Sequence, residues 1–171
     1  MFQIGGKIVY RDEVCTVKDI AKKYKNDEDY YVLQSSCDPS LVIRVPVSKT
    51  SAIMRALMTK KDIDELIEKI PDIPVVPVSN WNRGSEYKDL LGDGSHVSIV
   101  SIIKTAYLRQ QVKIERRQKA NESDKLYFRQ AERLLYNEIA AALDIPYDEA
   151  KSYIIQKVSG LAEQQPEEIT V

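Results

Sequence analysis

The sequence predicts an α+β protein of two domains, a small β domain over residues 1–55 and an all-helical domain over residues 56–160. The first part contains short β-branched segments separated by turn residues, which is typical of strands. From residue 51 onward, apolar residues repeat every three or four positions, which indicates helices packed on one face. Hydrophobic residues make up 43% and charged residues 30%, as in ordinary folded proteins. Residues 161–171 are rich in glutamate, and we expect them to form a disordered acidic tail.

The predicted strands are short, and several alternate between apolar and polar residues. They comprise residues 7–10, 13–20, 29–34 and 41–47. Four or five strands of this length are expected to roll into a small barrel-like sheet, whose edges are either protected or used for docking. Alternation in the last strand predicts that Arg44 points opposite to Ile43 and Val45, toward solvent. A solvated edge charge is the simplest interpretation of Arg44.

Three capping signals organise the helical part. Residues 59–62 have the form of a capping box and open a helix that Pro71 ends. Ser95 is expected to open a long helix, and Asn121 to cap the next one. A final helix is expected after Pro146, since proline is tolerated in a first helical turn.

The only tryptophan of the chain, Trp81, follows an extended, proline-containing connector over residues 73–78. Asn80 is expected to cap a helix with Trp81 in its first turn, followed by the cations Arg83 and Lys88. Two interpretations compete. A single aromatic side chain among cations suits a nucleic-acid contact, whereas composition alone favours Trp81 as a core anchor.

The charge of the chain is nearly balanced, with a formal net charge of −1. Binding to nucleic acid would therefore depend on local clusters of cations rather than on the field of the whole molecule. The largest such cluster lies in the C-terminal half of the predicted long helix. It contains Lys104, Arg109, Lys113, Arg116, Arg117 and Lys119. It is either a solvated helix end, favoured by the helix dipole, or a surface that faces phosphates.

Several classes of protein are not expected. No apolar run approaches the roughly 20 residues that span a bilayer, and the N-terminus lacks a signal-peptide pattern, so we expect a cytoplasmic protein with no membrane contact. In that compartment Cys15 and Cys37 are expected to be reduced. With His96 as the only histidine, we expect no metal, and no catalytic motif or cofactor loop is recognisable. The sequence therefore predicts a binding protein rather than an enzyme.

Four stretches, in this order, carry a resemblance to a known family. They are Phe-Gln-Ile-Gly-Gly-Lys-Ile-Val-Tyr at 2–10, Val-Ile-Arg-Val-Pro-Val at 42–47, Asn-Trp-Asn-Arg at 80–83 followed by Tyr-Lys at 87–88, and the cap and helix at 121–135. Over roughly residues 1–158 the chain resembles the CarD-like family of bacterial transcription regulators, in the short forms called CdnL. It departs from the family at residues 11–15, which lack the usual proline and His-Gly-type turn, and at residues 84–86, which are less basic. The chain thus resembles a divergent member.

The resemblance implies a Tudor-like β-barrel that docks on the RNA polymerase β subunit and a helical domain that contacts promoter DNA. The contact with DNA would lie in the minor groove at the upstream edge of the melted bubble, without sequence specificity, and would tune the stability of the open complex. The implied residues match family positions as follows: Arg44, with Lys22 or Lys23, for polymerase binding; Trp81 as the wedge; and Arg83, Lys88 and Lys125 beside the DNA backbone. We expect a nucleoid-associated monomer.

A protein–protein adaptor is the alternative. In that case the β domain would bind another partner, and the helical domain would make no direct DNA contact. The nearly neutral charge favours this alternative, as does Glu86, which would repel phosphate.

Overall fold

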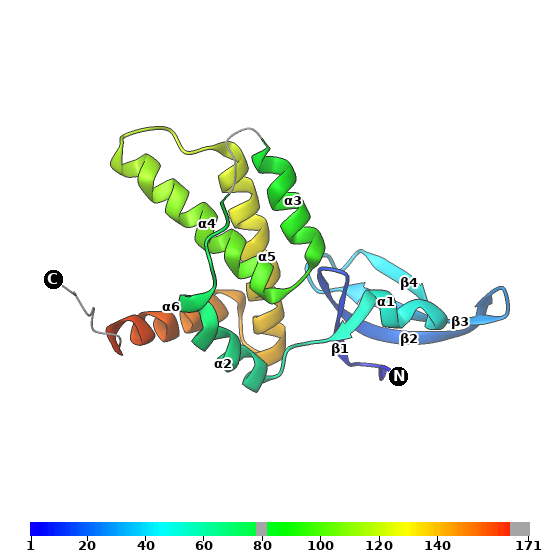
Figure 1. Ribbon diagram of the computed structural model, residues 1–171. Helices are drawn as coiled ribbons and strands as arrows, with labels where there is room; N and C mark the ends of the chain where they lie inside the picture. The colour runs from blue at the N-terminus through cyan, green and yellow to red at the C-terminus, as the bar shows by residue number, and fades with distance from the viewer. Residues whose placement is uncertain (78–81, 165–171) are drawn as a thin grey trace.

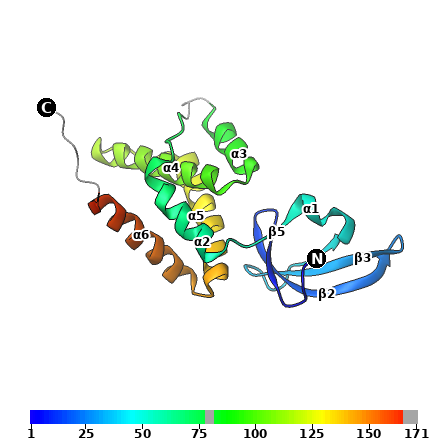
Figure 2. The same cartoon turned by 60° about the horizontal axis from the view of Figure 1, so that its bottom comes forward.

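A computed structural model describes residues 1–77 and 82–164. Within these ranges, a five-stranded antiparallel sheet is followed along the chain by most of the helices (Figure 1). The sheet, together with the short helix α1, lies at one end of the molecule and the remaining helices at the other, in both views (Figures 1 and 2). The predicted combination of a β-sheet with helices is confirmed.

The sheet has the order β4-β3-β2-β1-β5. Its strands are β1 (Lys7–Tyr10), β2 (Glu13–Lys25), β3 (Glu28–Ser35), β4 (Val42–Pro46) and β5 (Met54–Ala56). Strands β4 and β5 form the two edges of the sheet, and among the described residues no hydrogen-bonded ladder joins them. The sheet of the described residues is therefore open, and the expected closure into a barrel is not observed. The short strand β5 was not among the predicted segments. It crosses the expected domain boundary after residue 55.

The hairpin of β2 and β3 is longer than predicted, because β2 continues to Lys25. Asn26 and Asp27 form the turn with φ values of 54° and 58°, which matches the paired left-handed residues of a type I′ hairpin. Lys22 and Lys23 therefore lie at the end of a strand rather than in a loop. The pairing register shifts between Ala21 and Lys25, so regular alternation is lost there.

One face of the sheet carries a hydrophobic core of its own. Its buried residues are Ile8, Cys15, Val17, Tyr31, Leu33, Val45 and Met54. The amide of Phe2 donates a hydrogen bond to the hydroxyl of Tyr31 at 3.0 Å, which fixes the start of the chain to this core. Both cysteines are free thiols, and burial raises the pKa of Cys15 to about 11.

The helices are α1 (Thr50–Ile53), α2 (Lys60–Lys69), α3 (Arg83–Asp93), α4 (His96–Glu115), α5 (Glu122–Leu143) and α6 (Tyr147–Gln164). The predicted caps at Thr59, Ser95 and Asn121 are confirmed, since each side chain accepts a backbone hydrogen bond in the first turn. Pro71 lies in a 3-10 turn directly after α2, as expected. Helix α6 continues to Gln164, into the range for which a disordered tail is expected. Residues 165–171 lie outside the described part of the chain.

A second core lies between the helices. It is formed from α2 to α6, with fully buried Ile63, Tyr87, Ile102, Ala131 and Ile139 among its members. This core and the sheet core are separate clusters of buried residues. None of the helices in the described ranges is long and apolar enough to cross a membrane.

Candidate interaction surfaces

Arg44 belongs to an exposed aromatic and cationic surface on the sheet. Its guanidinium lies over the ring of Tyr24, 5.2 Å from the centroid, and the ring of Tyr24 meets that of Tyr30 edge-on at 5.3 Å. Tyr30 pairs with Pro46, two residues after Arg44, so Tyr30 and Arg44 share one face of the sheet. We call Tyr24, Tyr30 and Arg44 the Arg44 surface. The prediction that Arg44 faces solvent is confirmed.

Lys22 and Lys23 are exposed and paired with neighbouring carboxylates. Lys22 Nζ lies 2.8 Å from Asp29 Oδ2, and Lys23 Nζ lies 3.0 Å from Asp27 Oδ1. Exposed pairs of this kind are screened by water and contribute little, so both cations can exchange partners. Both lysines are therefore available to bind an acidic group of a partner, next to Tyr24 of the Arg44 surface.

The tyrosines of the Arg44 surface were not predicted. Strand alternation and pairing would have placed Tyr30 on the same face as Arg44 once the β3–β4 register was known. Tyr24 has no such signal, because it lies within the register shift of β2.

The predicted wedge Trp81 and the predicted cap Asn80 lie outside the described residues. Helix α3 begins at Arg83, with Asn82 as its N-cap residue, rather than at the expected position after Asn80. The helix ends at Asp93. Gly94 is its C-cap residue and has a φ of 66°, a conformation that glycine adopts without strain.

Helix α3 separates residues that the sequence placed together. Arg83 is only 9% exposed and Tyr87 is fully buried, whereas Lys88 is exposed. Arg83 and Tyr87 are four residues apart and therefore share a helix face, which here faces the helical core. Lys88 is thus exposed to solvent, while Arg83 is held inside.

A buried carboxylate on α5 explains the position of Arg83. Asp124 is 2% exposed, and its Oδ1 accepts a hydrogen bond from the hydroxyl of Tyr87 at 2.8 Å. Arg83 Nε lies 3.6 Å from the same oxygen, and Arg109 Nε, from α4, lies 3.5 Å from it. We call these four residues the Asp124 cluster. It joins α3, α4 and α5.

The hydroxyl of Tyr87 stays protonated in the Asp124 cluster. Burial, together with the hydrogen bond to Asp124, raises the pKa of Tyr87. Asn121 fixes the first turn of α5, because its Oδ1 accepts from the amides of Ser123 at 2.9 Å and Asp124 at 3.4 Å. The cluster therefore has a fixed carboxylate and a fixed hydroxyl donor.

The predicted basic cluster of α4 is divided by these contacts. Lys104 Nζ donates to the carbonyl oxygens of Ile70 at 2.8 Å and Ile73 at 2.5 Å, and Arg109 belongs to the Asp124 cluster. The helix ends at Glu115, so three of the cations lie in the connection to α5. These exposed cations are Arg116, Arg117 and Lys119. Lys125 is paired with Glu122, its Nζ lying 3.1 Å from Glu122 Oε1.

No protein-family model matches the chain, and a comparison with curated proteins finds no relative. The resemblance to the CarD-like family therefore stays a prediction based on the residues quoted above. In the described ranges, no three His, Cys, Asp or Glu side chains are grouped as metal ligands.

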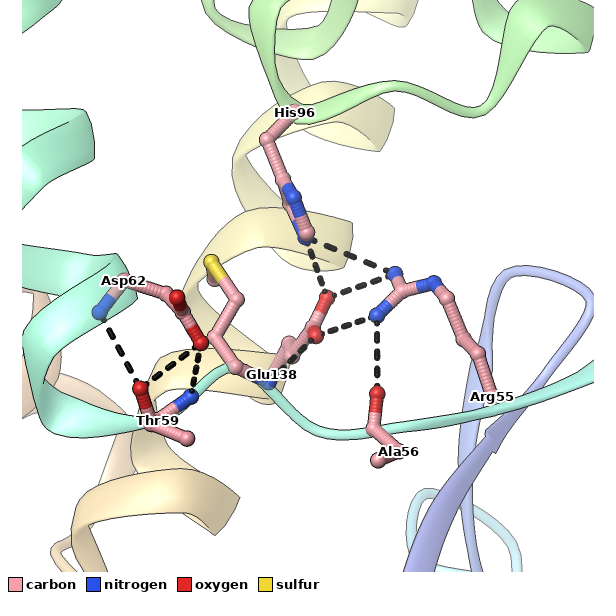
Figure 3. Close-up of polar contacts among 7 residues, drawn as sticks. Arg55, Ala56, Thr59, Asp62, His96 and Glu138 are labelled. Carbon is pink, nitrogen blue, oxygen red and sulfur yellow. Dashed lines mark hydrogen bonds and ion pairs between the residues drawn. The ribbon is translucent and has the colours of Figure 1, made fainter.

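A second buried carboxylate, Glu138 of α5, lies where the sheet meets the helices (Figure 3). Glu138 is 3% exposed. Arg55 of β5 donates from Nη1 to Oε1 at 2.5 Å and from Nη2 to Oε2 at 2.8 Å. His96 Nε2, at the start of α4, lies 2.8 Å from Oε2, and the amide of Met58 donates to Oε1 at 3.1 Å. Burial alone would raise the pKa of Glu138, but the hydrogen bonds from Arg55 and His96 outweigh it and lower the pKa from 4.5 to about 2.

This pKa predicts a pH-dependent contribution to stability. Because the pKa in the folded protein is lower than in the unfolded chain, the stabilisation is complete above pH 4.5 and is lost as the pH falls toward 2. Its full size is about 3 kcal/mol. We expect Glu138→Gln to lower the free energy of unfolding at pH 6, and the difference from wild type to shrink by more than half at pH 3. Urea unfolding at both pH values measures this, and a difference that does not change with pH would contradict it.

Proposed function

We propose that the protein is a transcription regulator that docks on the RNA polymerase β subunit through a Tudor-like β domain, residues 1–55, and contacts promoter DNA through a helical domain, residues 56–160. The contact lies at the upstream edge of the melted bubble and tunes the stability of the open complex. The observation that carries the proposal is the exposed Arg44 surface, in which Arg44 lies on the edge strand β4, the strand to which the resemblance assigns polymerase docking.

The edge position of β4 supports docking. An edge strand offers backbone donors and acceptors to a strand of a partner, and neighbouring side chains supply specificity. The Arg44 surface adds a guanidinium and two aromatic rings, residue types that are enriched at binding hot spots. Lys22 and Lys23 extend the positive charge toward an acidic partner.

The cations on the helical domain support contact with DNA. Lys88 is exposed on α3, and Arg116, Arg117 and Lys119 are exposed after α4. Such cations bind phosphates and position a protein without reading sequence. Trp81 would insert between base steps, at a cost of a few kcal/mol that is smallest where the duplex is already melted. A protein that binds the open promoter better than the closed duplex shifts the equilibrium toward the open state.

Substitution of Arg44 tests the docking step. We expect Arg44→Glu to weaken binding to the β subunit of bacterial RNA polymerase at least about tenfold, because a hot-spot cation is replaced by a repelling charge. A pull-down with the full chain measures the binding. Arg11→Glu is the matched control, since Arg11, in the turn between β1 and β2, is also exposed and lies over a tyrosine ring, 5.6 Å from the centroid of Tyr10. Equal binding by both variants and wild type would contradict the assignment of Arg44.

An adaptor without DNA contact is the second candidate, and the Asp124 cluster favours it. Buried Arg83 and half-buried Arg109 both lie beside the carboxylate of Asp124, which lowers the number of cations left for phosphates. The two functions differ in the salt dependence of binding to a forked DNA. A DNA-binding protein loses affinity steeply as salt is raised, in proportion to its phosphate contacts. An adaptor shows no binding to the fork at any salt concentration.

A further inference from the structure

We propose that Glu138 is a positioning residue that holds the helical domain in one fixed orientation relative to the sheet. It thereby fixes where the DNA-contacting residues lie relative to the Arg44 surface. The claim about orientation stands on the contacts of Glu138 alone. Its consequence for transcription rests on the proposed function.

The apolar part of the junction cannot set an orientation by itself. Val9 of β1 pairs with Val14 of β2, and both point away from the sheet core that Ile8 and Cys15 enter. Both valines line a small cavity together with Leu134 of α5. Hydrophobic contact of this kind is non-directional, so it holds the two parts together without fixing the angle between them.

The hydrogen bonds of Glu138 supply the missing direction. Arg55 pairs with Val9 in the β1–β5 ladder, so its side chain is attached to the sheet and lies on the same face as Val9. A bidentate pair between guanidinium and carboxylate fixes the relative plane of the two groups as well as their distance. One such pair therefore ties α5 to β5 with a defined geometry.

The same carboxylate also fixes the segment that connects the two parts. Between β5 and α2 the chain has only residues 57–59. Met58 donates its amide to Glu138, and Thr59 forms the capping box of α2 with Asp62 (Figure 3). His96 adds the start of α4 to the same group. Glu138 thus joins the edge of the sheet, the connector and two helices at one point.

The other polar contacts across the junction are weaker. Lys7 Nζ lies 2.9 Å from Asp144 Oδ1, and Asn137 Nδ2 donates to Cys37 Sγ at 3.3 Å, but both contacts are exposed. Exposed contacts of this kind are screened by water and contribute little. Replacing a buried ion pair by apolar residues of the same shape often makes a protein more stable. The best-supported role of such a pair is therefore to select one structural arrangement over others. This agrees with a positioning role for Glu138.

Residual dipolar couplings of backbone amides in the full chain test the orientation directly. In the wild type, the amides of the sheet and of α2 to α6 are expected to fit one alignment tensor. Glu138→Ala is expected to require two alignment tensors of different magnitude, one for the sheet and one for α2 to α6. Arg55→Ala is the second variant, because the side chain of Arg55 is 40% exposed and its loss leaves both cores intact. The double variant is expected to match the more affected single variant, since both substitutions break one pair.

Glu132→Ala is the matched control on the same helix. Glu132 pairs with Lys151 of α6 at 3.4 Å, which is a contact within the helical domain. This variant is expected to keep one tensor. If Glu138→Ala and Arg55→Ala also keep the single wild-type tensor, the positioning role is wrong.

Binding assays and a measurement of open-complex lifetime separate this inference from the proposed function. Glu138→Ala and Arg55→Ala are both expected to bind the isolated polymerase β subunit as wild type does, and to bind isolated forked DNA as wild type does. Both variants are expected to lose the effect on open-complex lifetime. If the variants need two tensors and yet retain the full effect, the positioning role in transcription is wrong. If the wild type itself has no effect on lifetime, the proposed function fails while the result on orientation stands.

Discussion

Asp124→Ala is expected to lower the free energy of unfolding by about 3–5 kcal/mol, the cost of removing one partner of a buried ion pair. The carboxylate is 2% exposed and faces Tyr87, Arg83 and Arg109. Without it, the buried hydroxyl of Tyr87 loses its acceptor and two guanidinium groups lose a neutralising charge. Urea unfolding followed by circular dichroism measures the change.

Two further substitutions control for side-chain loss and for charge. Asp148→Ala removes the same side chain from the first turn of α6, where Asp148 is exposed, and is expected to cost below about 1 kcal/mol. Asp124→Asn keeps an acceptor oxygen for Tyr87 and is expected to fall between the two alanine variants. If Asp124→Ala costs no more than Asp148→Ala, the Asp124 cluster does not stabilise the packing of the helices.

Trp81→Ala is expected to remove the effect of the protein on open-complex lifetime while binding to polymerase β stays unchanged. Stacking of an aromatic side chain on a base contributes about 1–3 kcal/mol, so affinity for a forked DNA should fall roughly 5- to 150-fold. Trp81→Phe keeps an aromatic face and is expected to retain part of the effect. Open-complex lifetime after challenge with a competitor measures both variants.

The same variant also tests the competing interpretation of Trp81 as a core anchor. As a DNA-contacting wedge, Trp81 contributes little to folding, and Trp81→Ala should change the free energy of unfolding by less than about 1 kcal/mol. A loss of several kcal/mol would identify Trp81 as a core residue and would overturn the wedge.

The sequence predicted the features that depend on neighbouring residues. The caps at Thr59, Ser95 and Asn121 each involve groups within a few positions of one another, so a local pattern identifies them. The solvent-facing side of Arg44 follows from strand alternation alone. Helical periodicity would also have separated Arg83 and Tyr87 from Lys88 if it had been applied to the segment after Trp81.

The features that were missed depend on residues far apart in the chain. Strand β5 is short, follows a helical turn and is defined by its pairing with β1. The pairing of Arg55 with Glu138, and of Arg83 and Arg109 with Asp124, joins segments that nothing in the local sequence relates. These two buried carboxylates decide which cations remain at the surface and how the sheet meets the helices.

The lifetime of promoter open complexes is the most direct test of the central claim. Bacterial RNA polymerase and a promoter would be combined with wild type, Arg44→Glu or Trp81→Ala at concentrations where wild type saturates the β subunit. The account predicts that wild type changes the lifetime and that each substitution abolishes the change, Arg44→Glu by loss of docking and Trp81→Ala by loss of the wedge. An unchanged lifetime with wild type under these conditions would contradict the account.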